Sequence, residues 1–252
     1  MNPRISAALL FMLLSRSVLL AVSPLVTDDA DTVEPGKVQL NCDFFVVRTA
    51  STSVYSVSPN PVLGLLPGLE FGAIFGYQWR DSSGPNLATS DASGVTDLTL
   101  APKFRLWQGL DEKVKFSARM DLKLPTAPGS RGLGTGNPDV GLVGIATYKL
   151  GKTSFDSNIG YYSVNIARPK FDDDRWFIGQ TVRYELNKEW NVITETYGLL
   201  PNTGAGGSAN WYFSGGLQSS VRENMVVTAL IGSAAGHKSP DVTGTFEVTL
   251  TF

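Results

Sequence analysis

Two consecutive segments of the sequence carry basic side chains at alternate positions. In one segment, Val114 to Leu124, these residues alternate with apolar ones. Because successive side chains on a β-strand point to opposite faces, all the basic groups lie on one face of the predicted strands. They form a basic arc, which we define as Lys103, Arg105, Lys115, Arg119 and Lys123. Inside a pore such an arc selects solutes by charge, whereas in a filled barrel it pairs with carboxylates and braces the interior.

Carboxylates occupy the polar phase of other segments. Asp121 falls within the basic arc and favours some pairing across strands. The remaining acidic candidates for a charge-selective lumen are Glu70, Glu185, Glu195 and Glu247. The sequence leaves both roles open for these residues, namely selectivity and bracing.

Residue types for other chemistry are sparse. The chain has one cysteine, Cys42, on an apolar phase, and one histidine, His237, with no visible catalytic partner. The acidic cluster Asp28, Asp29, Asp31 and Glu34 lacks the spacing and glycine of a calcium loop, so we expect a solvated leader. We therefore predict no enzyme, no metal site and no cofactor, and a solvated outer loop around Asp172–Asp174.

The composition favours strands over helices. Charged residues make up 17% of 252 residues, against about 25% in a typical soluble domain, and 26 Gly and 14 Pro supply turns. A net charge of −2 leaves no basic excess for nucleic acid, which we exclude as a partner. Apolar and polar residues alternate with period two over twelve predicted strands: 37–48, 59–66, 69–80, 95–107, 113–125, 138–150, 153–166, 174–186, 189–200, 209–221, 224–235 and 242–252.

The predicted connections alternate strictly between short and long. This pattern is typical of an even-stranded outer-membrane barrel with short periplasmic turns and longer outer loops. The short ones are 67–68, 108–112, 151–152, 187–188 and 222–223, and the long ones are 49–58, 81–94, 126–137, 167–173, 201–208 and 236–241.

Aromatic residues at the strand ends favour a membrane barrel over a soluble one. Trp79, Trp176 and Trp211 fall at outer ends and Tyr148 and Trp190 at inner ends, as two girdles require. Three irregularities accompany the pattern. The second strand is short. Residues 153–166 slip phase where Tyr161 and Tyr162 are adjacent, and this slip indicates a bulge or a short strand. Trp107 is out of phase with the other aromatic residues.

The N-terminus reads as a secretory signal. A basic start and an apolar stretch too short to span a bilayer predict a signal peptide at 1–23, with cleavage placed only loosely. We expect an acidic periplasmic leader at 24–36 and a β-barrel domain at 37–252. The predicted fold is an all-β, single antiparallel transmembrane β-barrel of about twelve strands.

Several segments resemble one family of bacterial proteins. The stretch Pro24–Leu40, the run Gly134–Gly141 leading to Tyr148–Leu150, the strand around Gly216–Gln218 and the terminal Phe252 are similar to the family named for a MetA pathway of phenol degradation. The resemblance covers nearly all of 24–252. It implies a transporter-like outer-membrane barrel that passes small molecules, aromatic ones included, and it carries over no catalytic residue.

These observations predict a bacterial outer-membrane channel or transporter for passive passage of small molecules, aromatic or anionic. The expected partners are outer-membrane lipid, a small-molecule solute and the outer-membrane assembly machinery, with Phe252 as the assembly signal. Two alternatives stay open: a structural or surface-exposed outer-membrane barrel without transport, and a secreted soluble β-barrel that binds a ligand.

Overall fold

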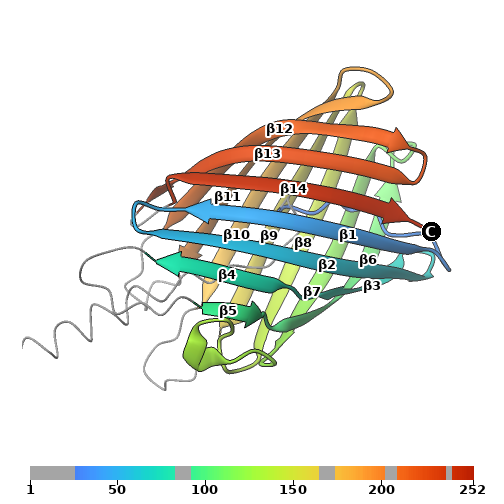
Figure 1. Ribbon diagram of the computed structural model, residues 1–252. Helices are drawn as coiled ribbons and strands as arrows, with labels where there is room; N and C mark the ends of the chain where they lie inside the picture. The colour runs from blue at the N-terminus through green and yellow to red at the C-terminus, as the bar shows by residue number, and fades with distance from the viewer. Residues whose placement is uncertain (1–25, 83–91, 165–173, 202–208, 237–239) are drawn as a thin grey trace, which may run out of the picture.

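The chain folds into a closed antiparallel β-barrel (Figure 1). The computed structural model describes residues 26–82, 92–164, 174–201, 209–236 and 240–252. The predicted signal peptide, His237 and residues 172–173 lie outside these ranges. The strands are β1 (Val38–Arg48), β2 (Thr52–Leu66), β3 (Leu69–Ile74), β4 (Tyr77–Ser82), β5 (Ala92–Val95), β6 (Leu98–Gly109), β7 (Val114–Leu124), β8 (Asp139–Leu150), β9 (Thr153–Val164), β10 (Arg175–Glu185), β11 (Trp190–Pro201), β12 (Asn210–Arg222), β13 (Met225–Gly236) and β14 (Val242–Thr251), with one 3₁₀ turn, η1 (Gly129–Arg131), between β7 and β8.

The wall has twelve strands, as the periodicity predicts. The first strand, β1, pairs with both β14 and β2, and this pairing closes the barrel. Two of the twelve are interrupted: β3 and β4 are consecutive parts of one strand, as are β5 and β6, and β3 pairs with β6 while β4 pairs with β5.

The interruption is held by hydrogen bonds rather than left open. The backbone N–H of Thr96 donates to the carbonyl of Gly76 at 2.9 Å, and the Ser58 hydroxyl donates to the carbonyl of Phe75. A Cβ on Gly76 would lie 2.7 Å from the carbonyl oxygen of Val57, so a side chain at this position would force the wall apart.

The second strand is longer than the sequence indicates. It spans 15 residues, Thr52–Leu66, and leaves a connection of only 49–51 after β1. Pro59 and Pro61 argue against a strand in the sequence, because proline lacks the N–H that a strand donates. In the structure they nevertheless pair with Cys42 and Leu40 of β1. The predicted short strand is therefore wrong, and so is the strict alternation of short and long connections at this one point.

The predicted irregularity at Tyr161 and Tyr162 is also wrong. Strand β9 pairs with β8 and β10 in unbroken register. Tyr161 faces outward against Trp176, with ring centroids 5.1 Å apart, and Tyr162 faces inward, where its hydroxyl donates to Asp121 at 2.8 Å. The two adjacent tyrosines thus lie on opposite faces of one regular strand.

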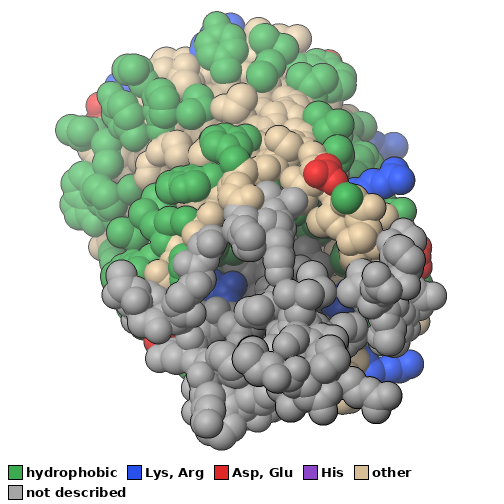
Figure 2. All heavy atoms as spheres, turned by 90° about the vertical axis from the view of Figure 1, so that its left-hand side faces the viewer, with side chains coloured by type: hydrophobic (Ala, Val, Ile, Leu, Met, Phe, Trp, Pro, Cys, Tyr) green, Lys and Arg blue, Asp and Glu red, His purple; other side chains and the backbone are tan. Residues whose placement is uncertain are grey.

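The apolar face of the strands points outward. Phe71, Phe116 and Met120 are each between 39% and 45% exposed, while the polar residues that alternate with them are buried inside. Figure 2, which looks onto the end that the tip of β4 approaches, shows hydrophobic side chains gathered around the outside of the barrel. A soluble barrel would have the opposite arrangement, so this alternative is excluded.

The aromatic side chains at the strand ends lie on this outer surface. Trp79, Trp176 and Trp211 near one end and Tyr148 and Trp190 near the other are all at least 36% exposed. Trp107 joins them, because the register between β6 and β7 shifts between Arg105 and Trp107 and returns this side chain to the outer face.

Among the described residues, no helix has the length and apolar character needed to cross a membrane.

Adjacent positions on β14 test the direction of the faces. Phe246 points outward and is 45% exposed, whereas Thr245 points inward and is partly exposed. Phe246→Arg should lower the free energy of unfolding in lipid vesicles by about 2–4 kcal/mol, because it places a charge against hydrocarbon near the middle of a strand. Thr245→Arg should cost less than about half of that, and equal losses for the two variants would contradict the assignment of the faces.

Candidate functional site: a charged lumen filled by the N-terminal segment

The acidic residues that precede β1 lie inside the barrel. The segment Val26–Glu34, called the N-terminal segment below, runs past the inner faces of β6 to β11, with Thr27 3% exposed and Ala30 fully buried. The expected solvated leader is therefore wrong. The physical reason is charge, because a wall with several inward basic groups is more stable when carboxylates lie against them.

Asp28 binds two residues of the basic arc. Its carboxylate accepts a hydrogen bond from the Arg119 guanidinium at 2.9 Å and one from the Lys103 ammonium at 3.2 Å. The Asn158 amide of β9 donates to the Asp28 carbonyl at 2.8 Å, and the Asp28 N–H donates to the Asn158 side-chain oxygen at 2.9 Å. The residue is thereby held from β6, β7 and β9 together.

Asp31, which is closer to β1 in the sequence, binds a second group of basic residues. Its carboxylate pairs with Lys115, with Lys149 at 3.6 Å and with Arg105 at 3.9 Å. Lys149 and Asp31 are 47% and 39% exposed, so water reaches this end of the segment.

The backbone of the N-terminal segment is satisfied by lumen side chains as well. Thr27 donates to the Glu195 carboxylate from its N–H at 2.7 Å and from its hydroxyl at 2.8 Å. The Ala30 carbonyl accepts from the Ser117 hydroxyl at 2.6 Å, and the Val33 N–H donates to Glu70 at 2.6 Å. These side-chain contacts satisfy backbone groups that would otherwise need hydrogen bonds to a neighbouring strand.

Most of the predicted lumen residues meet in this one network. Glu70 pairs with Lys103 at 3.0 Å, Arg119 with Asp121 at 2.9 Å, and Lys123 with Asp139. Glu247 lies apart on β14, where it is 8% exposed, opposite Asp43 of β1. Glu185 is exposed at the end of β10 and has no part in the network that the described contacts form.

The wall itself compensates only part of the basic arc. Glu70, Asp121 and Asp139 pair with three of its five basic side chains, which leaves an excess of two. In the ion pairs of the described residues, Arg105 and Lys115 reach a carboxylate only at Asp31. The N-terminal segment therefore supplies the missing negative charge.

Sequence reasoning missed several members of the network, namely Asp139, Asp156, Asn158 and Tyr162. It also misplaced Asp28, Asp29 and Asp31. A signal was available: the inward phase of 98–124 carries five basic residues against one acidic residue, and the chain has a cluster of three aspartates that belongs to no strand.

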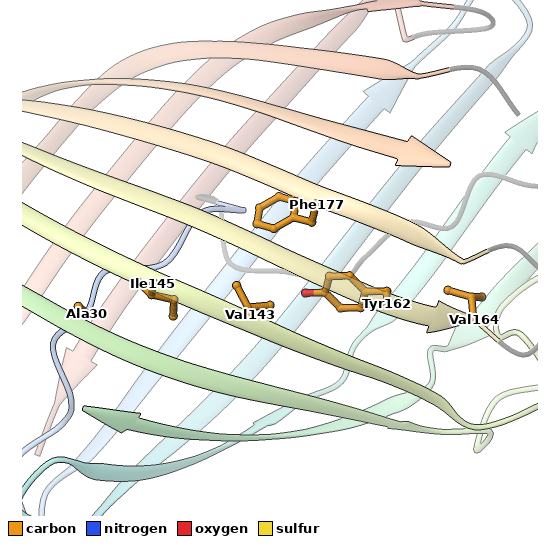
Figure 3. Packing of buried hydrophobic residues seen from close by; sticks show 6 residues of the cluster. All are labelled: Ala30, Val143, Ile145, Tyr162, Val164 and Phe177. Atoms are coloured by element: carbon orange, nitrogen blue, oxygen red, sulfur yellow. The ribbon is translucent and has the colours of Figure 1, made fainter. Parts of the chain in front are cut away.

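An apolar surface lies beside the charged network. Figure 3 shows the cluster that Ala30 of the N-terminal segment forms with Val143, Ile145, Tyr162, Val164 and Phe177, which come from β8, β9 and β10. Val26, Tyr197 and Leu199 pack against this cluster. The ring of Tyr197 stacks on Tyr212 with centroids 4.5 Å apart and lies 6.2 Å from Phe177.

The opposite part of the lumen wall is mostly uncharged. Some of its inward side chains, such as Asn41, Gln218 and Thr245, are partly exposed, while others, such as Asp43 and Thr228, are buried. The inward positions of β12, β13, β14, β1 and β2 carry no Lys or Arg in the part of the chain that the structure describes, and their acids are Asp43 and Glu247.

Neighbouring cations stabilise the ionised form of Asp28. Burial alone would raise the pKa of this carboxyl, but the Lys103 ammonium and the Arg119 guanidinium outweigh burial and hold the pKa below its usual range. A depressed pKa means that the stabilisation is present above the ordinary pKa of an aspartate and is lost only as the pH falls through the lowered value. At neutral pH the segment is therefore held by ionised pairs.

A closed antiparallel wall with an apolar exterior and a charged interior defines an outer-membrane β-barrel of the channel type. The chain belongs to the family described as "Putative MetA-pathway of phenol degradation", which matches residues 23–252. An outer membrane channel and a porin share this fold.

Solved structures show the same architecture. The COG4313 outer membrane channel from Pseudomonas putida F1 is similar over 89% of this chain and 98% of that one, with a TM-score of 0.68 and 16% identity. The KdgM porin is similar over 84% of this chain and 99% of that one, with a TM-score of 0.54 and 8% identity. Among curated proteins, none matches the chain.

Two basic residues that bind the N-terminal segment should differ strongly in their effect on stability. Arg119→Gln should lower the free energy of unfolding by about 3–5 kcal/mol, because it leaves Asp121 inside the barrel without its cation and Asp28 with Lys103 alone. Lys149→Gln, at a half-exposed pair with Asp31, should cost less than about 1 kcal/mol. Urea unfolding in vesicles measures both, and a similar cost for the two would contradict the buried network.

Proposed function

We propose that the protein is a passive channel for small organic molecules, with a preference for anions, and that the N-terminal segment closes part of its lumen. The observation that carries this proposal is the insertion of Asp28 and Asp31 among Lys103, Lys115 and Arg119. A carboxylate of the chain occupies each place where a carboxylate of a solute would bind.

The N-terminal segment is suited to leave without unfolding the wall. It forms no strand, and charged and polar contacts hold much of it, while the strands on either side are paired with each other. Its release would leave two uncompensated positive charges on the basic arc. Charges in a narrow passage are less screened than in bulk solution, so small anions would then be favoured over cations.

The family's description supports small aromatic molecules as one class of solute, because it refers to phenol degradation. The aromatic and apolar surface beside the arc, with Phe177, Tyr197 and Tyr212, is compatible with that class. We assign the end with the short turns to the periplasm, so that a solute passes from the outer loops toward the N-terminal segment.

Assembly and lipid contact belong to the same proposal. Phe252 is 68% exposed at the end of the β1–β14 seam, where its backbone N–H donates to the Val38 carbonyl at 2.8 Å. The terminal side chain is thus free to be read by the outer-membrane assembly machinery before the barrel closes, and the apolar exterior contacts lipid.

Loosening the N-terminal segment should reveal the preference for anions. In planar bilayers, Asp28→Asn with Asp31→Asn should raise the conductance and shift the reversal potential across a salt gradient toward anions, because it exposes the excess charge of the basic arc. Adding Lys115→Gln to this double variant should move the reversal potential back toward that of the wild type.

Glu185→Gln is the matched control, since Glu185 is exposed at a strand end outside the network. It should leave the reversal potential unchanged. An unchanged reversal potential in the double variant would mean that the basic arc braces the interior and does not select ions. The absence of conductance in every variant would point instead to a structural barrel without transport.

A further inference from the structure

The first three described residues of the chain present three different chemical groups to the lumen in a fixed order. Val26 packs against the apolar cluster, Thr27 donates two hydrogen bonds to Glu195, and Asp28 places its carboxylate on Lys103 and Arg119. Each group meets a wall of matching chemistry.

The wall side of this arrangement is a built site. Lys103, Arg119 and Glu195 are each at most 8% exposed, and they come from β6, β7 and β11. Phe177, Tyr197 and Tyr212 supply aromatic surface from the neighbouring inward positions of β10, β11 and β12. A basic pair, an acceptor and an aromatic surface therefore lie on one side of the lumen.

Gly179 shows how closely the N-terminal segment fits this side. A Cβ on Gly179 would lie 2.2 Å from the methyl group of Thr27, so the strand makes room for the segment with a glycine. The hydroxyls of Thr27 and Thr181 are also in contact.

We propose that this site, Lys103, Arg119, Glu195 and the rings of Phe177, Tyr197 and Tyr212, binds a small aromatic carboxylate in the place that Val26–Asp28 occupies. This inference rests on the proposed function and names its substrate class. The carboxylate of the solute replaces that of Asp28, and its ring replaces the side chain of Val26.

The spacing sets the shape of the ligand. One residue separates Val26 from Asp28, so their Cα atoms lie at most about 7 Å apart. A phenyl ring reaches this span from a carboxylate through a two-carbon spacer. The polar acceptor between them sets a second requirement. When Thr27 leaves, the buried Glu195 loses two donors, so a ligand with a hydroxyl between ring and carboxylate replaces one of them and binds more tightly.

Binding to the folded, detergent-solubilised full chain tests this inference by calorimetry, independently of conductance. The triple variant Val26→Gly, Thr27→Gly, Asp28→Gly keeps the chain length and removes all three competing groups. It should bind 3-phenylpropionate at least tenfold more tightly than the wild type, because the intramolecular competitor is gone.

The ligand series separates the three contacts. In the triple variant, 3-phenyllactate should bind several-fold more tightly than 3-phenylpropionate, and butyrate and 3-phenylpropanol should each bind at least tenfold more weakly. Equal affinity for butyrate and 3-phenylpropionate would overturn the aromatic part of the site, and equal affinity for the alcohol would overturn the basic part.

Two tyrosines provide matched wall variants in the same background. Tyr197→Leu, inside the lumen, should weaken the binding of 3-phenylpropionate several-fold, whereas Tyr184→Leu, on the outer surface at 48% exposure, should leave it unchanged. If the triple variant does not fold, Asp28→Asn alone should still show the gain over the wild type, and no gain in either variant would overturn the proposal.

The proposed channel and the proposed binding site can be contradicted independently, because conductance tests the first and calorimetry tests the second. A protein that binds 3-phenylpropionate but does not conduct keeps the site and loses the proposed channel. A protein that conducts anions but shows no difference among these ligands keeps the channel and loses the site.

Discussion

The pairing of inward basic side chains with carboxylates governs the interior of this barrel. The charges are enclosed by a wall whose outer face is apolar, so each unpaired cation inside would be costly. Glu70, Asp121 and Asp139 pair with part of the basic arc from within the wall. Asp28 and Asp31 complete the pairing, and this is why a segment that precedes the first strand lies in the lumen.

The same constraint divides the lumen into two sides. Against β6 to β11, the N-terminal segment fills the interior, and inward residues such as Thr147 and Asn158 are buried. Against β12 to β14 and β1, the inward residues are mostly uncharged, and some of them, such as Asn41 and Thr245, keep contact with solvent. The charged groups and the segment that neutralises them therefore gather on one side of the interior.

Much of the wall could be predicted from the sequence, because period-two alternation over 10 to 15 residues is a strong local signal. Strand number, inward and outward faces, and the inner turns follow from it. The second strand was hidden by Pro59 and Pro61, whose pairing with β1 depends on a neighbour distant in sequence. The break between β3 and β4 was missed for a related reason, since the contacts that hold it come from Ser58 of β2 and from Thr96, which lies between β5 and β6.

The candidate site was only half predictable. The inward direction of Lys103, Lys115 and Arg119 follows from local alternation, but their partners lie 74 to 91 residues away in the N-terminal segment. Local patterns describe Asp28 to Asp31 as a solvated acidic stretch, because nothing nearby neutralises it. Only a charge balance over the whole lumen indicates where these aspartates belong.

The position of the N-terminal segment can be tested by one disulfide. The side-chain hydroxyls of Thr27 and Thr181 are in contact, so cysteines at these two positions, in a Cys42→Ser background, lie close enough to join if the segment occupies the lumen. Measured on outer membranes by gel mobility with and without reductant, the Thr27→Cys, Thr181→Cys protein should form this cross-link in most molecules. The Thr27→Cys, Val182→Cys protein should not, because residue 182 faces outward. Absence of the cross-link in the first protein, or equal cross-linking in both, would contradict a lumen neutralised by the N-terminal segment.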